Sequence, residues 1–185
     1  MNSHLSLIGV EDGWFKPHSP NDKTVLCCVN IVGKKIYEVK TRWIQVDGTD
    51  ATMMLLEMLV NVQFDAIILG GISYAGFNII DALTLNNAVH KPVIVYIPKK
   101  PGSVAMRNAL RKHFSDWENR WKLVEQLGEV YNVVIRSGQP EIFFEVIGAN
   151  CKEAVDFLQY AAMTCRTPEP VRIAGLIARG LTRPY

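Results

Sequence analysis

Two short stretches decide the fold: residues 65–71 read DAIILGG, and residues 92–98 read PVIVYIP. Each is a continuous apolar run, which is typical of a parallel β-strand covered on both faces. A helix-length segment near residues 78–89 connects the two runs. Together they predict a β-α-β unit in the middle of the chain.

The first third of the chain predicts three more strands. Residues 5–10, 24–32 and 36–46 are rich in apolar and β-branched side chains. Gly33 with two lysines can turn the chain between the last two strands, and Glu11-Asp12-Gly13 is expected to form a turn after the first. We expect strands at 5–10, 24–32, 36–46, 65–70 and 92–97 to form one sheet. The first three would be antiparallel in sequence, and the last two parallel to the first.

The rest of the chain predicts helices and a further β-rich segment. Helical patterns occupy residues 51–62, 104–114, 116–127, 151–163 and 170–181, and residues 130–147 are β-rich. The sequence contains no internal repeat and no linker. The predicted fold is therefore a single α/β domain over residues 1–185, with a mixed sheet of five or more strands flanked by helices.

Composition narrows the class of protein. The chain has 185 residues, of which 49% are hydrophobic and 21% charged, so it is globular rather than disordered or collagen-like. The four cysteines form no C-x-x-C spacing, which favours buried, reduced thiols. With no signal-like or membrane-spanning run, we expect a cytoplasmic protein with no membrane partner.

Charged residues follow several predicted strands. Glu11 and Asp12 follow the first strand, Asp47 the third, and Lys99 and Lys100 the fifth. Because ligands bind outside the carboxyl ends of strands in open α/β sheets, these acids predict a Mg²⁺ or Mn²⁺ site. Lys99 would then stabilise charge on a leaving phosphate oxygen. Ordinary turn chemistry and helix capping remain the alternative, since Asp-Gly is a common turn sequence.

The glycine-rich segment 70–78 lies between a buried strand and a helix. Gly71 would let the backbone approach a phosphate or base, and Asn78 would stand at the start of the helix. Neither a Walker A motif nor G-x-G-x-x-G is present, so nucleoside triphosphate hydrolysis and NAD binding lose their usual motifs. A tight turn that needs only small residues is the alternative.

Basic residues are unevenly distributed, although the net charge is only +2. Residues 98–122 hold seven Lys or Arg against two acids, and the C-terminal segment adds further arginines. Such a stretch can form a phosphate-binding surface for DNA or RNA, with Lys100, Arg107, Arg111 and Arg172 as candidate contacts. Solvated helix faces are the alternative. The sequence names no protein partner and no oligomeric state.

Several segments together resemble domain-of-unknown-function family 99, an uncharacterised and mostly archaeal family. The segments are GVEDGWF (9–15), VDGTDAT (46–52), GISYAGFN (71–78), PVIV (92–95) with KKP (99–101), and PEPVRIA (168–174) with LIA (176–178). That family is similar to endonuclease V and belongs with the ribonuclease H-like folds. The resemblance spans nearly the whole chain, in the expected order.

The resemblance implies a metal site and a lysine at the strand ends. Glu11 or Asp12 would stand where endonuclease V holds its first metal-binding aspartate, Asp47 near its second acid, and Lys99 near its lysine. Two positions depart from the pattern, because Gly70 replaces an aspartate and Gly175 replaces a histidine. The predicted function is nucleic-acid binding, with metal-dependent phosphodiester cleavage weakened by these two losses. A non-catalytic interaction or nucleotide-binding protein with the same fold is the alternative.

Overall fold

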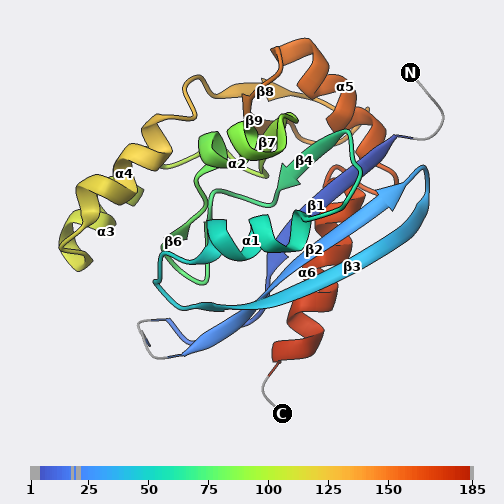
Figure 1. Ribbon diagram of the computed structural model, residues 1–185. Helices are drawn as coiled ribbons and strands as arrows, with labels where there is room; N and C mark the ends of the chain where they lie inside the picture. Colours follow the sequence, from blue (N-terminus) through green and yellow to red (C-terminus); the bar gives the residue numbers. More distant parts are fainter. Residues whose placement is uncertain (1–4, 18, 20–21, 184–185) are drawn as a thin grey trace.

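A computed structural model describes residues 5–17, 19 and 22–183. Its centre is a seven-stranded mixed sheet with the strand order β3-β2-β1-β4-β7-β9-β8 (Figure 1). A separate two-stranded hairpin, β5 (Ser73–Tyr74) and β6 (Asn78–Ile79), lies within the glycine-rich segment. The fold is therefore of the predicted α/β class, and its seven strands agree with the expected sheet of five or more.

The first three strands form the predicted antiparallel meander. They are β1 (Ser6–Asp12), β2 (Lys23–Val32) and β3 (Lys35–Gln45). β1 pairs antiparallel with β2, and β2 pairs antiparallel with β3. The expected turn at Glu11 and Asp12 is wrong, because β1 continues through both residues. The reason is the long β2, whose Cys27 and Leu26 pair with them.

The predicted parallel strands are also confirmed. β4 (Ala66–Leu69) is parallel to β1, and β7 (Val93–Ile97) is parallel to β4. The β-rich segment supplies β9 (Ile142–Ile147), antiparallel to β7, and β8 (Tyr131–Val133) at the far edge. Because β1, β4 and β7 are parallel, their carboxyl ends share one edge of the sheet, called here the strand-end edge.

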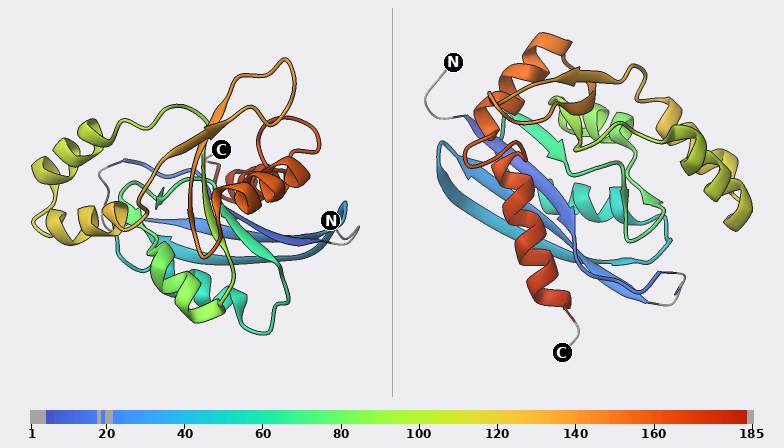
Figure 2. Two further views of the ribbon diagram at one scale, coloured as in Figure 1. Left: turned by 90° about the horizontal axis from the view of Figure 1, so that it is seen from above. Right: turned by 180° about the vertical axis from the view of Figure 1, so that it is seen from behind.

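Helices cover both faces of the sheet (Figure 2). α1 (Ala51–Leu59) and α2 (Ala82–Val89) pack on one face, in the core cluster around Ile8, Ile67 and Val95. α5 (Cys151–Ala161) and α6 (Glu169–Thr182) pack on the other. α3 (Ser103–His113) and α4 (Trp117–Glu125) form a helical arm that extends from the side of the sheet.

α6 lies very close to β1 because β1 has a glycine at the point of contact. A Cβ atom at Gly9 would lie 2.1 Å from the carbonyl carbon of Pro170 and 2.3 Å from the nitrogen of Val171.

The four cysteines are free, and Cys27 and Cys28 are buried in β2. Burial raises the pKa of the Cys27 thiol to about 11 and of the Cys28 thiol to about 12, which keeps both protonated.

The helix expected over residues 78–89 begins later than predicted. Asn78 belongs to β6, and α2 starts after Asp81, whose carboxylate accepts a hydrogen bond from the Thr84 nitrogen at 2.9 Å. Asp50 precedes α1 as expected but does not cap it. Its Oδ1 atom instead accepts hydrogen bonds from the backbone nitrogen of Gln45 and the side chain of Asn78. Residues 78 and 79, which the sequence assigned to the helix, therefore belong to the hairpin instead.

Candidate functional site

Two adjacent acids lie at the strand-end edge. Glu11 and Asp12 are the last residues of β1, and both side chains are half-buried. The carboxyl group of Glu11 lies against Gly70, at the end of β4. A Cβ atom on Gly70 would lie 2.7 Å from both Cδ and Oε1 of Glu11. Gly70 therefore leaves the space that the Glu11 carboxyl group fills.

The two acids share an environment that favours protonation. Burial raises the pKa of Glu11 to about 7, and the neighbouring charge of Asp12 adds to this shift. Burial also raises the pKa of Asp12, while the hydrogen bond from the Ala75 nitrogen counteracts it. Tyr74 is fully buried nearby, and both acids contribute to the high pKa of its hydroxyl. Near neutral pH the pair of carboxyl groups therefore binds a proton readily.

Asp12 and Asp47 hold the same three-residue segment. Asp12 Oδ2 accepts a hydrogen bond from the Ala75 nitrogen at 2.5 Å, and Asp47 Oδ1 accepts one from the Phe77 nitrogen at 2.9 Å. The Asp47 nitrogen also donates to the Ala75 carbonyl at 2.8 Å. The predicted gathering of acids and glycine loop at one edge is thus observed, with the loop lying between Asp12 and Asp47.

The backbone is left-handed at two positions of this segment and at Asp47, which holds it. Asp47, Ala75 and Gly76 have φ angles of 56°, 45° and 88°. A Cβ atom on Gly76 would lie against Oδ1 of Asp47, so glycine is required by both its φ angle and its contact. Asp tolerates a positive φ better than most residues, which explains its place after β3. Residue type therefore favours the loop conformation at Asp47 and Gly76, whereas Ala75 adopts a positive φ without such a preference.

The two loop residues predicted to contact nucleic acid differ in accessibility. Gly71 has a φ angle of 139°, and no heavy atom lies within 4 Å of the position of an added Cβ, so the space beside its Cα is open, although its carbonyl accepts a hydrogen bond from the Tyr74 hydroxyl. Asn78 is fully buried. Its amide donates to the Gln45 carbonyl and to Asp50, and accepts from the Ala51 nitrogen. Asn78 therefore fixes the loop to α1 and does not face solvent.

An arginine that the sequence reasoning missed also faces the acids. Arg179 of α6 lies over Gly175, where an added Cβ atom would be 2.8 Å from Nη2 and 3.0 Å from Nη1. Its charge lowers the pKa of both Glu11 and Asp12, against the larger effect of burial. The spacing of Gly175 and Arg179, one helical turn apart, is the sequence signal that could have found it.

Four of the other predicted cations are exposed, and the fifth is held in an ion pair. Lys99 and Lys100 are exposed just beyond the carboxyl end of β7, at the strand-end edge. Arg107 and Arg111 are exposed on α3, with their guanidinium groups over Trp117 at 6.0 and 5.5 Å from the ring centroid. Arg172 is different, since it forms an ion pair with Glu169 at 2.6 Å and its charge is largely compensated.

Arg120 is counted in the basic stretch but does not belong to its surface. It is only 8% exposed. Its Nη1 atom donates to the carbonyl oxygens of Gly48 at 2.9 Å and Phe77 at 2.6 Å, and Nε donates to Asp116. Arg120 therefore ties the helical arm directly to the loop that Asp12 and Asp47 hold. The exposed cations of the arm are positioned relative to the acid pair by this contact.

The donor set bears on a metal site. Within residues 5–17, 19 and 22–183, no three His, Cys, Asp or Glu side chains gather as a group able to hold an ion. Glu11 and Asp12 are adjacent, whereas Asp47 lies on the other side of the loop; Asp12 and Asp47 each use one carboxylate oxygen to hold that loop. A two-ion centre needs a bridging carboxylate, and the corresponding space at Gly70 is filled by Glu11. Two carboxylates with retained waters fit one Mg²⁺ or Mn²⁺ ion.

Comparison with known proteins places this chain in a family. A family model described as endonuclease dU matches residues 3–182. The chain belongs to the endonuclease dU family. A UPF0215 protein of Thermococcus sibiricus is 37% identical, covering 94% of this chain and 90% of its own length. A UPF0215 protein of Pyrococcus horikoshii is 34% identical, covering 96% and 92%. The predicted membership of an archaeal family is thus confirmed, and the family is the one described as endonuclease dU.

Solved structures share the fold of this endonuclease dU family member. A protein of unknown function from Archaeoglobus fulgidus has a TM-score of 0.82 at 26% identity, covering 98% of this chain and 99% of its own. Human ENDOV has a TM-score of 0.65 at 13% identity, covering 98% and 86%. Endonuclease V of Ciona intestinalis, in complex with DNA containing an inosine, has a TM-score of 0.62 at 13% identity, covering 96% and 85%. Among the helices described here, none is long and apolar enough to span a membrane.

Proposed function

We propose that this protein binds nucleic acid across the strand-end edge and cleaves a phosphodiester bond placed over Glu11 and Asp12. The observation that carries the proposal is the half-buried acid pair, which lies at the same edge as the exposed cations of Lys99 and Lys100. The arm carrying Arg107 and Arg111 is fixed to that edge through Arg120. The exposed cations suit the phosphate groups of a nucleic acid, and the acid pair suits a metal cation that accompanies it.

The side chains around the acid pair have distinct roles in this proposal. Glu11 and Asp12 would hold one Mg²⁺ or Mn²⁺ ion, which supplies Lewis-acid polarisation of the phosphate. The carboxyl groups would have to be ionised to hold the ion, so binding of the ion would be coupled to loss of the proton from this pair. Arg179 provides positive charge beside the pair on the α6 side. Lys99 neutralises charge on the leaving oxygen, as its place beyond β7 suggests.

The name of the family and the DNA of its structural neighbour suggest which substrate to test first. The family is described as endonuclease dU, and the Ciona neighbour was solved with inosine-containing DNA. Both deoxyuridine and inosine are products of base deamination. The open space beside the Cα of Gly71 would leave room beside the acids for an extruded base, since no side chain occupies that space. We therefore propose DNA with a deaminated base as the preferred substrate.

Titration against nucleic acids tests the binding step. The protein is mixed with single- and double-stranded DNA and RNA, with and without a deoxyuridine or inosine, in Mn²⁺ or in EDTA. Binding is read by fluorescence anisotropy, and cleavage by denaturing gels. We expect binding that falls with salt, with a log–log slope of about −0.9 per phosphate contact on duplex DNA. Absence of binding to every nucleic acid at low salt would refute the proposal.

Matched lysine variants test the location of binding. The pair K99A/K100A removes two exposed cations from the strand-end edge, while K34A/K35A removes two exposed cations from the β2–β3 turn. Only the first pair should weaken binding and flatten the salt slope by about two contacts, at about −0.9 each. Arg107→Ala and Arg111→Ala should add to this loss. Equal losses from both lysine pairs would show non-specific attraction and contradict the assignment.

Acid variants separate cleavage from binding. E11A and D12A remove cation ligands but also remove negative charge from the edge, so binding should remain and cleavage should disappear. Loss of binding in these variants would place the acids in the contact surface instead. Binding without any cleavage in wild type would support the non-catalytic alternative named from the sequence.

A further inference from the structure

The outer edge of β3 is open. β3 is the last strand of the seven-stranded sheet, and its only partner among the described strands is β2. It is 11 residues long and contains no proline. A long edge strand without proline presents a row of backbone donors and acceptors that another strand can pair with. The edge therefore has the geometry of a strand-addition site.

Apolar side chains on this strand are exposed. Ile36, Val39 and Trp43 are 52%, 41% and 57% exposed. They lie on the α6 side of the sheet, since they oppose Ile31, Val29 and Val25, which pack beneath α6. The α6 cluster of buried residues contains no residue of β3. The apolar side of β3 thus continues the surface beside α6 without a cover of its own.

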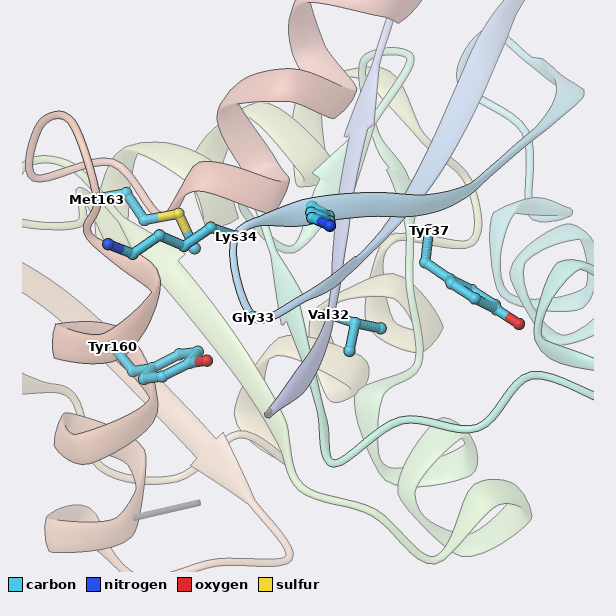
Figure 3. Close-up of a pocket in the computed structure, with 7 residues that line it drawn as sticks. Val32, Gly33, Lys34, Tyr37, Tyr160 and Met163 are labelled. Carbon is cyan, nitrogen blue, oxygen red and sulfur yellow. The ribbon is translucent and has the colours of Figure 1, made fainter. Parts of the chain in front are cut away.

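A bulge directs one aromatic residue outward. The β2–β3 register shifts between Asn30 and Ile31, so Tyr37 is the extra residue on β3. Tyr37 is 77% exposed. Tyr37 is one of the residues that line the cavity of about 650 Å³ at the β2–β3 turn, and Figure 3 shows it on the opposite side from Met163 and Tyr160, with its ring pointing away from them. Strict alternation along β3 would put Ile36 on the same face as Glu38, and the bulge is the reason that Ile36 lies on the other face.

The charged side of β3 is self-complementary. Glu38 and Lys40 lie on the α1 side, two residues apart, and form an ion pair at 3.4 Å within the strand. When an antiparallel copy of β3 is paired about a two-fold axis through Val39, Glu38 of each copy opposes Lys40 of the other. Opposite charges directly across an antiparallel pair are stabilising. Moving the axis to Lys40 would instead place two lysines opposite each other.

We propose that β3 pairs with β3 of a second copy of this chain, antiparallel and in the register centred on Val39. In this register Val39 opposes Val39, Tyr37 opposes Thr41, and the Glu38–Lys40 pair occurs twice. The interface is isologous, as a two-fold dimer requires. Because β3 is parallel to β1, the two strand-end edges point in opposite directions and both acid pairs stay open. The inference is independent of the proposed function.

Charge reversal on β3 tests the register. Oligomeric state is measured by sedimentation velocity and light scattering on the full chain over about 1 to 500 μM. Wild type should dimerise, while E38K and K40E should each raise the dimer dissociation constant tenfold or more, because each places like charges opposite each other twice. The double variant E38K/K40E restores both opposite-charge pairs and should return to the wild-type constant.

A symmetric cross-link provides a second measurement. Val39→Cys places two cysteines opposite each other only in the proposed register, and oxidation should then give a covalent dimer. Thr41→Cys is the matched control, because Thr41 would oppose Tyr37. Both are made with Cys151 and Cys165 changed to Ser, since those two thiols are not fully buried. Circular dichroism confirms that each variant is folded.

Three results would overturn the proposal. The first is a wild-type chain that stays monomeric to 500 μM, which would leave the edge to another protein or to solvent. The second is a dimer that neither E38K nor K40E weakens. The third is cross-linking of the Thr41 variant as fast as that of the Val39 variant, which would show a different register.

Discussion

Replacement of Gly70 by alanine tests how the acid pair is built. An added Cβ would lie 2.7 Å from Cδ and Oε1 of Glu11 and 2.8 Å from Cγ, all well inside van der Waals contact. Overpacking of this kind costs about 1–3 kcal/mol, and the lower part of that range applies where a flexible side chain can move aside. We therefore expect Gly70→Ala to destabilise the fold by about 1–2 kcal/mol.

The cost should disappear when Glu11 is shortened. Glu11→Ala removes all three contacting atoms, and replacing glycine by alanine then gains about 0.4–1 kcal/mol from the unfolded chain. The double-mutant cycle should accordingly give a coupling free energy of about 2 kcal/mol between the two positions. No other heavy atom comes as close to the Gly70 site, so the coupling is specific to this pair.

Urea denaturation followed by tryptophan fluorescence measures both terms. With a slope of about 2 kcal/mol per molar urea, Gly70→Ala should lower the midpoint by about 0.5–1 M in wild type. Gly71→Ala is the control, because its cost arises from a φ of 139° with no nearby atom and should be equal in both backgrounds. An equal cost of Gly70→Ala with and without Glu11 would refute the packing described here.

Three further predictions concern pH, the arm and the loop. Burial raises the pKa of Glu145 to about 7, so the unfolded chain loses this proton at lower pH than the folded one. Stability should therefore fall from about pH 4.5 to 7 and then level off, and Glu145→Gln should remove about 1–2 kcal/mol of this fall in urea titrations. Arg120→Ala should cost about 2–4 kcal/mol, because it leaves two carbonyls without a donor, and hydrogen exchange should speed up over residues 98–128. Asp47→Ala should lower the free energy of unfolding by about 1–3 kcal/mol and Asp47→Asn by less than about 1 kcal/mol. Asparagine tolerates the φ of 56° and keeps an oxygen that accepts the hydrogen bond from the Phe77 nitrogen. Equal thermal stability of the two variants would contradict this.

The local sequence was sufficient to locate β1, β2, β3, β4 and β7 and their relative directions, but not the β5–β6 hairpin or the directions of β8 and β9. The runs 66–69 and 93–97 carry no charged side chain because both faces of β4 and β7 are covered, by helices on either side. The short turn at Gly33 reverses the chain, so β3 could pair with β2 only in the antiparallel direction. Parallel strands end at a common edge, so the places of Glu11, Asp12 and Asp47 followed from strand order alone.

The tertiary structure decided which side chains serve the site and which support it. Asn78, Arg120 and Arg172 have the residue types of ligand contacts, but burial or an ion pair occupies each of them. Arg179 is separated by 168 residues from Glu11, and only the packing of α6 on β1 brings its charge to the acids. Residue type is a property of the chain, whereas burial and charge pairing depend on which distant segments meet. For this reason the sequence predicted the edge where the site lies, and the fold determined its members.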